Sequence, residues 1–243
     1  MRELLAAQRR RVRRVWMGEG LAPSPLLDEI EKLARRTNVR LETVSKNKID
    51  AHAATDAPQG VIAYAEPIKP LAIADLCEPR GTREALLLVV SGVTDPHNLG
   101  SLLRSAECAG VTGVVVAKHR CAHLSPTVAK AAAGALEYLD FSVVGGIPNA
   151  LLSLRSFGVV TVGLAASSPR SIYETELPRA PIALVVGGEE RGISPLTLRR
   201  CDYVLSIPQY GSIESLNVAV AGAIGCFQVA RCQSAGSPSA GSP

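Results

Sequence analysis

Three apolar runs in this chain each pass into a loop that is rich in glycine and polar side chains. The runs cover residues 86–93, 182–186 and 203–207, and the loops that follow read TDPHNLG, GGEERG and PQYGSIESLN. Uninterrupted apolar runs of this length are typical of strands buried on both faces of a parallel sheet. The carboxyl ends of such strands share one edge, where α/β folds bind their ligands. The sequence therefore predicts an α/β fold with a ligand site built from these loops.

The third loop carries the densest group of functional side chains. Pro208 ends strand pairing, and Gly211 permits a tight turn. A helix is predicted for residues 215–231, with Ser215 as its N-cap. Capping needs only one polar residue, so a group of several polar side chains in this loop favours a functional role. Four such side chains stand within six residues: Ser212, Glu214, Ser215 and Asn217.

These segments resemble, in order and spacing, the three motifs of the SpoU/TrmH family of RNA 2′-O-ribose methyltransferases. The resemblance covers roughly residues 86–229 and rests on three separate motifs, each of which alone would be weak. It implies S-adenosyl-L-methionine as the methyl donor and a ribose 2′-hydroxyl as the acceptor. It also implies a parallel-sheet SPOUT domain with a deep trefoil knot, an exception to the general rule against knotted chains.

Residue-by-residue matching to the motifs implies donor contacts in the second and third loops. Gly187, Ile207 and Leu216 are the expected contacts to S-adenosyl-L-methionine, and Leu164, at the end of an earlier strand, is a fourth candidate. No GxGxxG motif follows an early strand, so the sequence does not support a dinucleotide-type Rossmann site.

The resemblance also implies a set of catalytic residues: Asn98, Arg104, Glu189, Ser215 and Asn217. A ribose hydroxyl is a weak acid, so its methylation needs removal of the proton or stabilisation of the developing oxyanion. The family arginine has been proposed as a base assisted by substrate phosphate. A guanidinium stays protonated in proteins, which favours a cationic role for Arg104 on phosphate and oxyanion. Glu189, Ser215 and Asn217 are expected to orient Arg104 and the ribose.

Simpler interpretations exist for some of these residues. Arg104 could simply be a cation on the surface of a helix. Glu190 and Arg191 could simply form an exposed ion pair. Ala219 stands where the family often has serine, which we expect to affect activity only slightly.

Residues 1–66 are predicted to form a small α/β domain similar to the L30e-like RNA-binding domain of SpoU-family rRNA methyltransferases. Residues 1–48 carry 12 Lys and Arg against 6 Asp and Glu, whereas the remainder has 14 against 16. A basic segment on a near-neutral body favours a polyanionic partner, here RNA. Pro58 departs from the histidine usual in such domains, and the chain starts inside the expected first helix. The expected phosphate contacts are Arg9, Arg10, Arg11, Arg13 and Arg14.

The rest of the chain divides into a linker, the methyltransferase domain and a tail. Residues 67–84 hold three prolines and a glycine and are predicted as a linker with one short helical turn at 73–77. Residues 85–232 alternate helices, expected at 100–108, 126–138 and 148–156, with strands at 113–117, 141–144 and 159–164. Residues 233–243 are expected to be a disordered tail.

No metal site, disulfide framework or membrane segment is expected. His119, Cys121 and His123 alternate along the chain, but a fourth ligand at a suitable spacing is missing. The six cysteines include no CxxC pair and are predicted to be reduced core residues. No apolar run approaches the ~20 residues of a membrane span, and no signal region follows the N-terminus, so a cytoplasmic protein is predicted.

Three functions are compatible with the sequence. The first is methylation of large-subunit (23S-type) rRNA, favoured by the additional N-terminal domain. The second is the same chemistry on tRNA, whose family enzymes often carry basic extensions in place of that domain. The third is a non-catalytic RNA-binding protein, disfavoured by the intact polar positions of the motifs. The resemblance further implies a homodimer in which Arg104 acts across or beside the subunit interface. An apolar stripe on the last helix suits a shared surface: Leu216, Val220, Ala223, Ile224 and Phe227.

Overall fold

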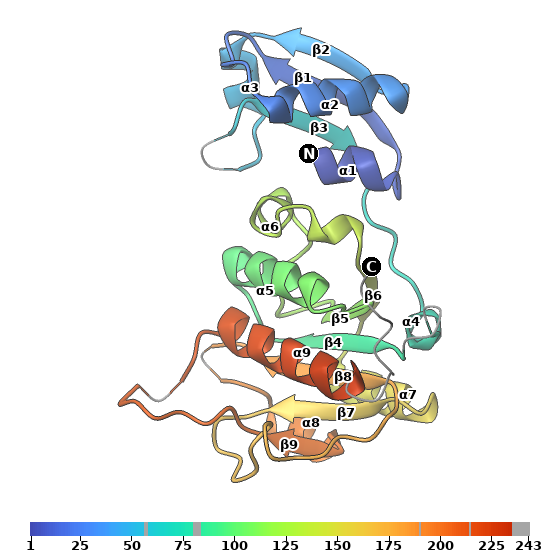
Figure 1. Cartoon of the computed structure of the whole chain (residues 1–243), viewed down its shortest axis with the longest axis vertical. Coiled ribbons are helices and arrows are strands. Elements are labelled where there is room, and N and C mark those ends of the chain that lie inside the picture. Colours follow the sequence, from blue (N-terminus) through green and yellow to red (C-terminus); the bar gives the residue numbers. More distant parts are fainter. Residues whose placement is uncertain (56–57, 80–83, 190, 214, 235–243) are drawn as a thin grey trace, which may run out of the picture.

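The computed structural model describes residues 1–55, 58–79, 84–189, 191–213 and 215–234. They form two α/β units stacked along the long axis of the molecule and joined by an extended segment (Figure 1). A three-stranded sheet lies in the N-terminal domain and a six-stranded sheet in the C-terminal domain.

The N-terminal domain packs helices on both faces of its small sheet. The strand order is β2-β1-β3, with β1 and β2 parallel and β3 antiparallel to β1. Ser24 caps the second helix through the backbone N–H of Leu27, and Pro25 occupies its first position, as the sequence predicts. The elements are α1 (Arg2–Ala7), β1 (Val12–Gly18), α2 (Pro25–Arg36), β2 (Arg40–Val44), α3 (Lys46–His52) and β3 (Val61–Ala65).

Each face of this sheet has its own apolar cluster. Val15 packs with Leu5 of α1 and with Ile30 of α2 on one face. Trp16 packs with Ile49 of α3 on the other. Helix α3 was not predicted, because Ile49 is its one buried side chain and leaves no apolar periodicity to detect.

The C-terminal domain contains a sheet in which every strand pair is parallel. Its order is β6-β5-β4-β8-β7-β9. The central strands are buried on both faces, which explains their uninterrupted apolar sequences. The predicted α/β parallel-sheet class is confirmed. The strands are β4 (Leu86–Ser91), β5 (Gly113–Ala117), β6 (Asp140–Val144), β7 (Val160–Leu164), β8 (Ile182–Gly187) and β9 (Tyr203–Leu205).

Helices cover both faces of this sheet. One apolar cluster joins α5, α6 and α9 to the sheet, and a second joins α4, α7 and α8 to its other face. Helix α4, which lies within the predicted linker, buries Leu76 in the second cluster. The helical elements are α4 (Ile73–Cys77), α5 (Pro96–Cys108), α6 (Pro126–Ala131), the 3₁₀ turn η1 (Ala135–Glu137), α7 (Ile147–Ser156), α8 (Pro195–Arg200) and α9 (Val218–Ser234).

Several predicted helix boundaries were wrong. Helix α5 begins at Pro96, not Gly100, because Asp95 accepts hydrogen bonds from two backbone N–H groups of the first turn. The helix predicted at 126–138 breaks after Ala131, where Ala133 and Gly134 adopt φ values of 51° and 103°. Helix α8 was not predicted. The knot implied by the family resemblance stays a prediction, and residues 235–243 lie outside the described part of the chain.

The two domains meet where α1 approaches η1. A Cβ on Gly134 would lie 2.3 Å from Cγ of Glu3, so the glycine permits this approach. Arg10 donates from Nε to Oε2 of the buried Glu137 at 2.9 Å and from Nη1 to the carbonyl oxygen of Glu66 at 3.0 Å. Arg9 pairs with Asp140 in the same region. Arg9 and Arg10, expected on RNA phosphates, therefore hold the two domains together.

Candidate active site

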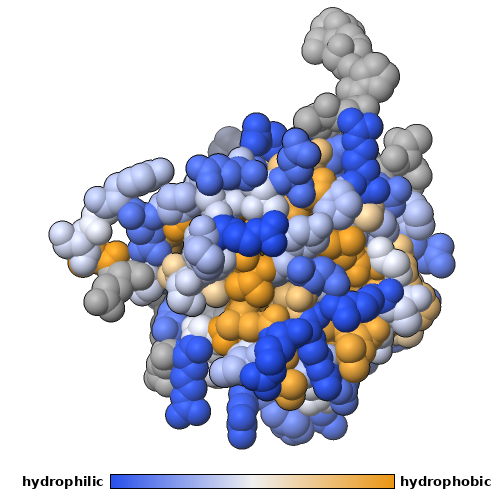
Figure 2. All heavy atoms as spheres, turned by 90° about the horizontal axis from the view of Figure 1, so that it is seen from below, coloured by the Kyte–Doolittle hydropathy of each residue, from blue (hydrophilic) through white to orange (hydrophobic). Residues whose placement is uncertain are grey.

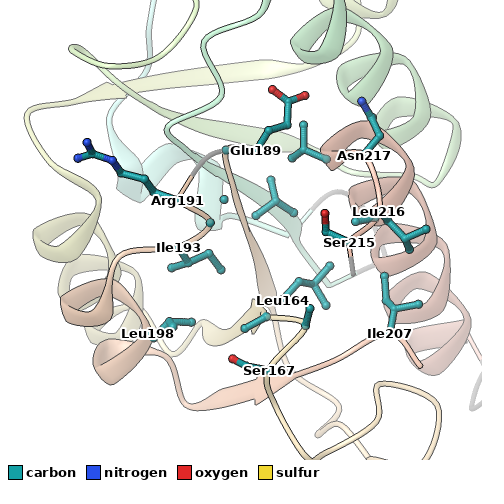
Figure 3. Close-up of a pocket in the computed structure, with 18 of the residues that line it drawn as sticks. Leu164, Ser167, Glu189, Arg191, Ile193, Leu198, Ile207, Ser215, Leu216 and Asn217 are labelled. Carbon is teal, nitrogen blue, oxygen red and sulfur yellow. The ribbon is translucent and has the colours of Figure 1, made fainter. Parts of the chain in front are cut away.

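A cavity of about 470 Å³ opens at the carboxyl ends of β7, β8 and β9. Leu164 closes β7, Gly187 closes β8, and Ile207 follows β9, and all three line the cavity. Leu164, Ile193, Leu198 and Ile207 surround one part of it, whereas Glu189 and Asn217 lie at the opposite end (Figure 3). The cavity thus has an apolar part and a polar end.

The second motif loop forms its wall mainly from backbone. The N–H of Gly188 donates to the carbonyl oxygen of Ser91 at 2.9 Å, and the N–H of Gly192 donates to the carbonyl oxygen of Gly188 at 2.9 Å. A Cβ on Gly187 would lie 2.1 Å from the carbonyl carbon of Gly192, and one on Gly188 would lie 2.0 Å from the carbonyl oxygen of Gly92. Only glycine allows these backbone segments to approach so closely.

The third motif loop runs along the other side of the cavity. Ser215, Leu216 and Asn217 all line it (Figure 3). The predicted helix start at Ser215 was wrong, because Asn217 caps the helix: its Oδ1 accepts from the N–H of Ala219 at 2.8 Å, and α9 begins at Val218. Ser215 is thereby free to face the cavity. Glu214 lies outside the described residues.

Three polar side chains from the three motifs form one hydrogen-bonded group. Nδ2 of Asn98 donates to Oε1 of Glu189. Nδ2 of Asn217 donates to Oδ1 of Asn98 at 3.0 Å. Asn98 stands in the first turn of α5, not in a preceding loop, because Asp95 caps that helix. The first-motif asparagine thus links the second and third motifs at the polar end of the cavity.

Arg104 lies apart from this group. It is exposed on α5 and does not line the cavity. Within the described part of the chain it makes no hydrogen bond or ion pair. Of the nine predicted site residues, seven line the cavity, Asn98 contacts two of those seven, and Arg104 contacts none.

Some cavity residues were not singled out from the sequence. Gly192, Ile193, Leu198 and Gln209 line the cavity, and so does Arg191, for which an exposed pair with Glu190 had been an alternative. Arg191 stands two residues after the motif acid Glu189 in GGEERG, and this proximity in sequence was the signal that could have drawn attention to it. Leu198 could not be identified from the sequence, because α8 is too short to show an apolar periodicity. Glu190 lies outside the described residues.

The cysteines and the HRCAH segment are not among the described residues that line the cavity. Burial raises the pKa of Cys121 and of Cys201 to about 11, and that of Cys226 to about 12, so these thiols are neutral. Cys108 is exposed, contrary to the expectation of core cysteines. Among the described residues no three His, Cys, Asp or Glu side chains are grouped to hold a metal ion. The described helices include none with the length and apolar character of a membrane span.

The fold and the site define a SpoU-type methyltransferase architecture. Residues 85–227 match the SpoU rRNA Methylase family, and residues 2–71 match the family described as RNA 2'-O ribose methyltransferase substrate binding. The chain belongs to the SpoU rRNA methylase family, as the motif resemblance predicted.

Curated relatives align with most of this chain. The 23S rRNA (guanosine-2'-O-)-methyltransferase RlmB of Pseudomonas putida is 36% identical over 231 residues, which span 94% of this chain and 92% of that protein. The protein of the same name from Nitrosomonas europaea is 41% identical over 204 residues, 84% of this chain and 78% of its own.

Solved structures agree in fold. A crystal structure of an RNA 2'-O ribose methyltransferase superimposes with a TM-score of 0.75 at 27% identity, covering 96% of this chain and 86% of that one. The SpoU methyltransferase AviRb from Streptomyces viridochromogenes, in complex with the cofactor AdoMet, has a TM-score of 0.77 at 24% identity, with 96% and 87% coverage.

Proposed function

We propose that this protein is an S-adenosyl-L-methionine-dependent RNA 2′-O-ribose methyltransferase that acts on large-subunit rRNA. The observation that carries the proposal is that the second and third motif loops line one cavity and that Asn98 of the first motif bonds to Glu189 and Asn217 at its polar end. The names of the RlmB relatives support the same chemistry and the same class of RNA.

The cavity suits the methyl donor in chemistry and in construction. S-adenosyl-L-methionine combines a flat apolar purine with a charged amino-acid part, and the cavity has an apolar part and a polar end. Leu164, Ile207 and Leu216 supply apolar contacts. Gly187 and Gly188 keep side chains away from the backbone wall, which leaves backbone groups to hold the donor. When bound, the donor supplies a methyl group activated by a sulfonium centre.

The polar group at the cavity end holds the acceptor ribose. Oε1 of Glu189 accepts from Asn98, and its second oxygen makes no hydrogen bond to the described residues. That oxygen accepts the hydrogen bond of a ribose hydroxyl and orients it toward the donor. Asn217 fixes Asn98 from the other side. Ser215 offers a further hydroxyl on the cavity wall.

Arg104 supplies positive charge to the RNA from a neighbouring subunit or from beside the interface. Its guanidinium stays protonated, so it binds phosphate and stabilises the developing oxyanion and does not remove the proton. Its exposed position outside the cavity lining suits a site that is completed by a second copy.

The predicted apolar stripe of α9 supports this homodimer. Helix α9 packs inward through Val218, Val229 and its glycines: a Cβ on Gly222 would lie 2.3 Å from Cδ1 of Leu102 in α5. Two large members of the stripe are not covered by this packing, because Val220 and Phe227 are 48% and 51% exposed. A second subunit would cover this exposed part of the stripe. Apolar surface is also exposed at the end of the molecule that lies away from the N-terminal domain (Figure 2).

A direct comparison of RNA substrates tests the proposed specificity. We expect labelled methyl transfer to unmodified 23S-type rRNA from a cell lacking the endogenous enzyme, and little transfer to unmodified tRNA. Because this RNA is made and assembled in the cytoplasm, we expect the protein there. Faster transfer to tRNA would favour the second candidate. Donor and RNA binding without transfer would favour a non-catalytic RNA-binding protein.

A further inference from the structure

The arginines near the N-terminus divide into groups with different surroundings. Arg9 and Arg10 pair with Asp140 and Glu137 of the C-terminal domain. Arg14 lies over the rings of Trp16 and Tyr64, 4.7 and 4.4 Å from their centroids. These three cations are thus engaged within the protein, although the sequence offers no reason to separate them from their neighbours.

Three further arginines, Arg11, Arg13 and Arg36, meet beside Arg9 and Arg10 in a groove of the N-terminal domain. The groove has a volume of about 1070 Å³ and lies between the end of α1, the start of β1 and the end of α2. Five arginines contribute to its lining, and no aspartate or glutamate is among the described lining residues. The lining comprises Leu4, Leu5, Gln8, Arg9, Arg10, Arg11, Val12, Arg13, Arg36, Thr37, Asn38 and Val39.

Three of these arginines have guanidinium groups that are available to bind an anion. Arg11 and Arg36 are exposed and make no ion pair within the described ranges. Arg13 is 69% exposed and approaches Glu66 only to 4.0 Å. The C-terminal end of α2 reaches the groove at Thr37 and contributes about half a negative charge, as helix ends do. Three guanidinium groups outweigh that partial charge, so the groove attracts anions.

The groove lies far from the cavity of the active site in the fold. In Figure 1 the strands of the large sheet end at the left, where the cavity is, whereas the α1–β1 and α2–β2 connections lie at the right of the N-terminal domain. An anion in the groove therefore cannot be the nucleotide that is methylated in the same subunit.

We propose that Arg11, Arg13 and Arg36 bind the sugar-phosphate backbone of the RNA at a place remote from the target ribose. The proposal rests on the proposed function, because it takes RNA as the substrate. Arginine suits this role because its planar fork donates two hydrogen bonds to phosphate oxygens. The ion pairs of Arg9 and Arg10 hold the groove in a fixed position relative to the active site. The groove then adds affinity for long RNA without taking part in the chemistry.

A charge-reversal pair tests the groove against a matched control. The test variant is Arg11→Glu with Arg36→Glu. The control is Arg35→Glu with Arg199→Glu, which changes the net charge equally at two exposed arginines outside the groove lining. Binding of unmodified 23S-type rRNA is measured at several salt concentrations, together with donor affinity, thermal unfolding, and KM and kcat for methyl transfer.

We expect the groove variant to bind RNA roughly 10-fold or more weakly, with a salt slope reduced by about 2, because each lost phosphate contact lowers the slope by about 1. KM should rise while kcat and donor affinity stay near wild type. The control should keep most of the RNA affinity. An equal loss in the control would overturn the proposal in favour of net charge alone. Unchanged RNA affinity with a lower melting temperature would overturn it in favour of a purely structural role.

The same data separate this inference from the proposed function. RNA binding that depends on the groove, in a wild-type protein that transfers no methyl group, would reject the methyltransferase and keep the groove. Methyl transfer by the groove variant with an unchanged KM would reject the groove and keep the methyltransferase.

Discussion

At the scale of single residues, Asn217 has two separable tasks. Its Oδ1 caps α9 through Ala219, and its Nδ2 bonds to Asn98. We predict that Asn217→Ala lowers the free energy of unfolding by about 1 kcal/mol, the usual loss for a missing cap. Asn217→Ser should keep most of that stability, because serine also caps helices. Both variants should lose methyl transfer, because neither reaches Asn98.

Urea unfolding and single-turnover kinetics on the two variants separate these tasks. If the serine variant were as active as the wild type, the hydrogen bond between Asn217 and Asn98 would not be needed for catalysis. If it were as unstable as the alanine variant, the cap assignment would be wrong.

Gly187 lines the site, but its replacement would not be a simple test of donor binding. A side chain there would collide with the backbone of Gly192 and Ile193 before it reached the cavity. Replacement of Gly187 is therefore expected to disturb folding of the loop and donor binding together. Ala166 lies on the exposed rim of the same cavity, so Ala166→Trp is a better probe of donor occupancy.

At the scale of elements, Asp202 connects the start of the edge strand β9 to its neighbour β7 in the large sheet. Its Oδ2 accepts from the N–H of Thr161 at 2.9 Å and from its hydroxyl at 2.7 Å, and Oδ1 accepts from Arg155 at 2.7 Å. Partial burial raises the pKa of Asp202, but the hydrogen bonds from Thr161 and the charge of Arg155 outweigh it, and the net pKa is lowered.

A lowered carboxyl pKa gives a definite pH dependence of stability. The contribution of Asp202 is present above its unfolded pKa, about 4, and is lost as the pH falls through the lower folded pKa. We predict that Asp202→Asn melts at a lower temperature than the wild type at pH 7. The two melting curves should converge as the pH falls below about 4. A difference in melting temperature that stayed constant across this range would contradict the assignment.

The elements recognised from the sequence are those whose apolar pattern is strong. The strands of the large sheet were found because both of their faces are buried, and the loops were found because glycine and polar residues follow each strand. Helices α3 and α8 were not predicted, because each buries a single side chain, Ile49 in α3 and Thr197 in α8. Ser215 and Asn217 are both good caps, and only the tertiary bond to Asn98 decides between them.

The sequence predicted seven of the residues that line the candidate site but not how they are arranged. The motifs bring together Asn98, Glu189 and Asn217, whose contacts span 91 and 119 residues of sequence. The exposure of Arg104 could not be predicted from the neighbouring sequence, because the position of a residue in a helix does not reveal which element packs against it. The pairing of Arg10 with Glu137 was likewise invisible, since the partners are 127 residues apart.

At the scale of the whole molecule, the domain junction depends on one buried acid. Glu137 is 5% exposed and is paired with Arg10. Removal of Arg10 breaks the guanidinium pair of that carboxylate, which costs about 3 kcal/mol for a buried pair, although the α-ammonium of Met1 still interacts with Glu137. We predict that Arg10→Ala speeds hydrogen exchange of amides in α1 and η1 roughly 100-fold, through opening of the junction.

Arg9→Ala is the matched control, because Arg9 is 42% exposed in its pair with Asp140. It should change exchange much less, as exposed pairs contribute about 1 kcal/mol or less. Equal exchange in the Arg10 variant and the wild type would show that the junction does not need this pair.

The proposed dimer predicts complementation between subunits. Arg104→Ala and Glu189→Gln should each lose methyl transfer far more than donor affinity, because their help is concentrated in the transition state. Mixed dimers should recover part of the activity, since one of the two sites then contains both intact residues. Absence of recovery, with mixed dimers demonstrated by mass spectrometry, would place Arg104 in the same chain as its site. An active monomer in light scattering would reject the dimer.

The central claim is that the cavity delivers a methyl group to a ribose oxygen of RNA. The most direct measurement is digestion of 23S-type rRNA after reaction with isotope-labelled S-adenosyl-L-methionine, followed by mass spectrometry of the nucleosides. We expect one labelled nucleoside methylated on its 2′-oxygen, formed by the wild type and strongly reduced with Glu189→Gln. Label on a base, or equal label with the Glu189 variant, would contradict the central claim.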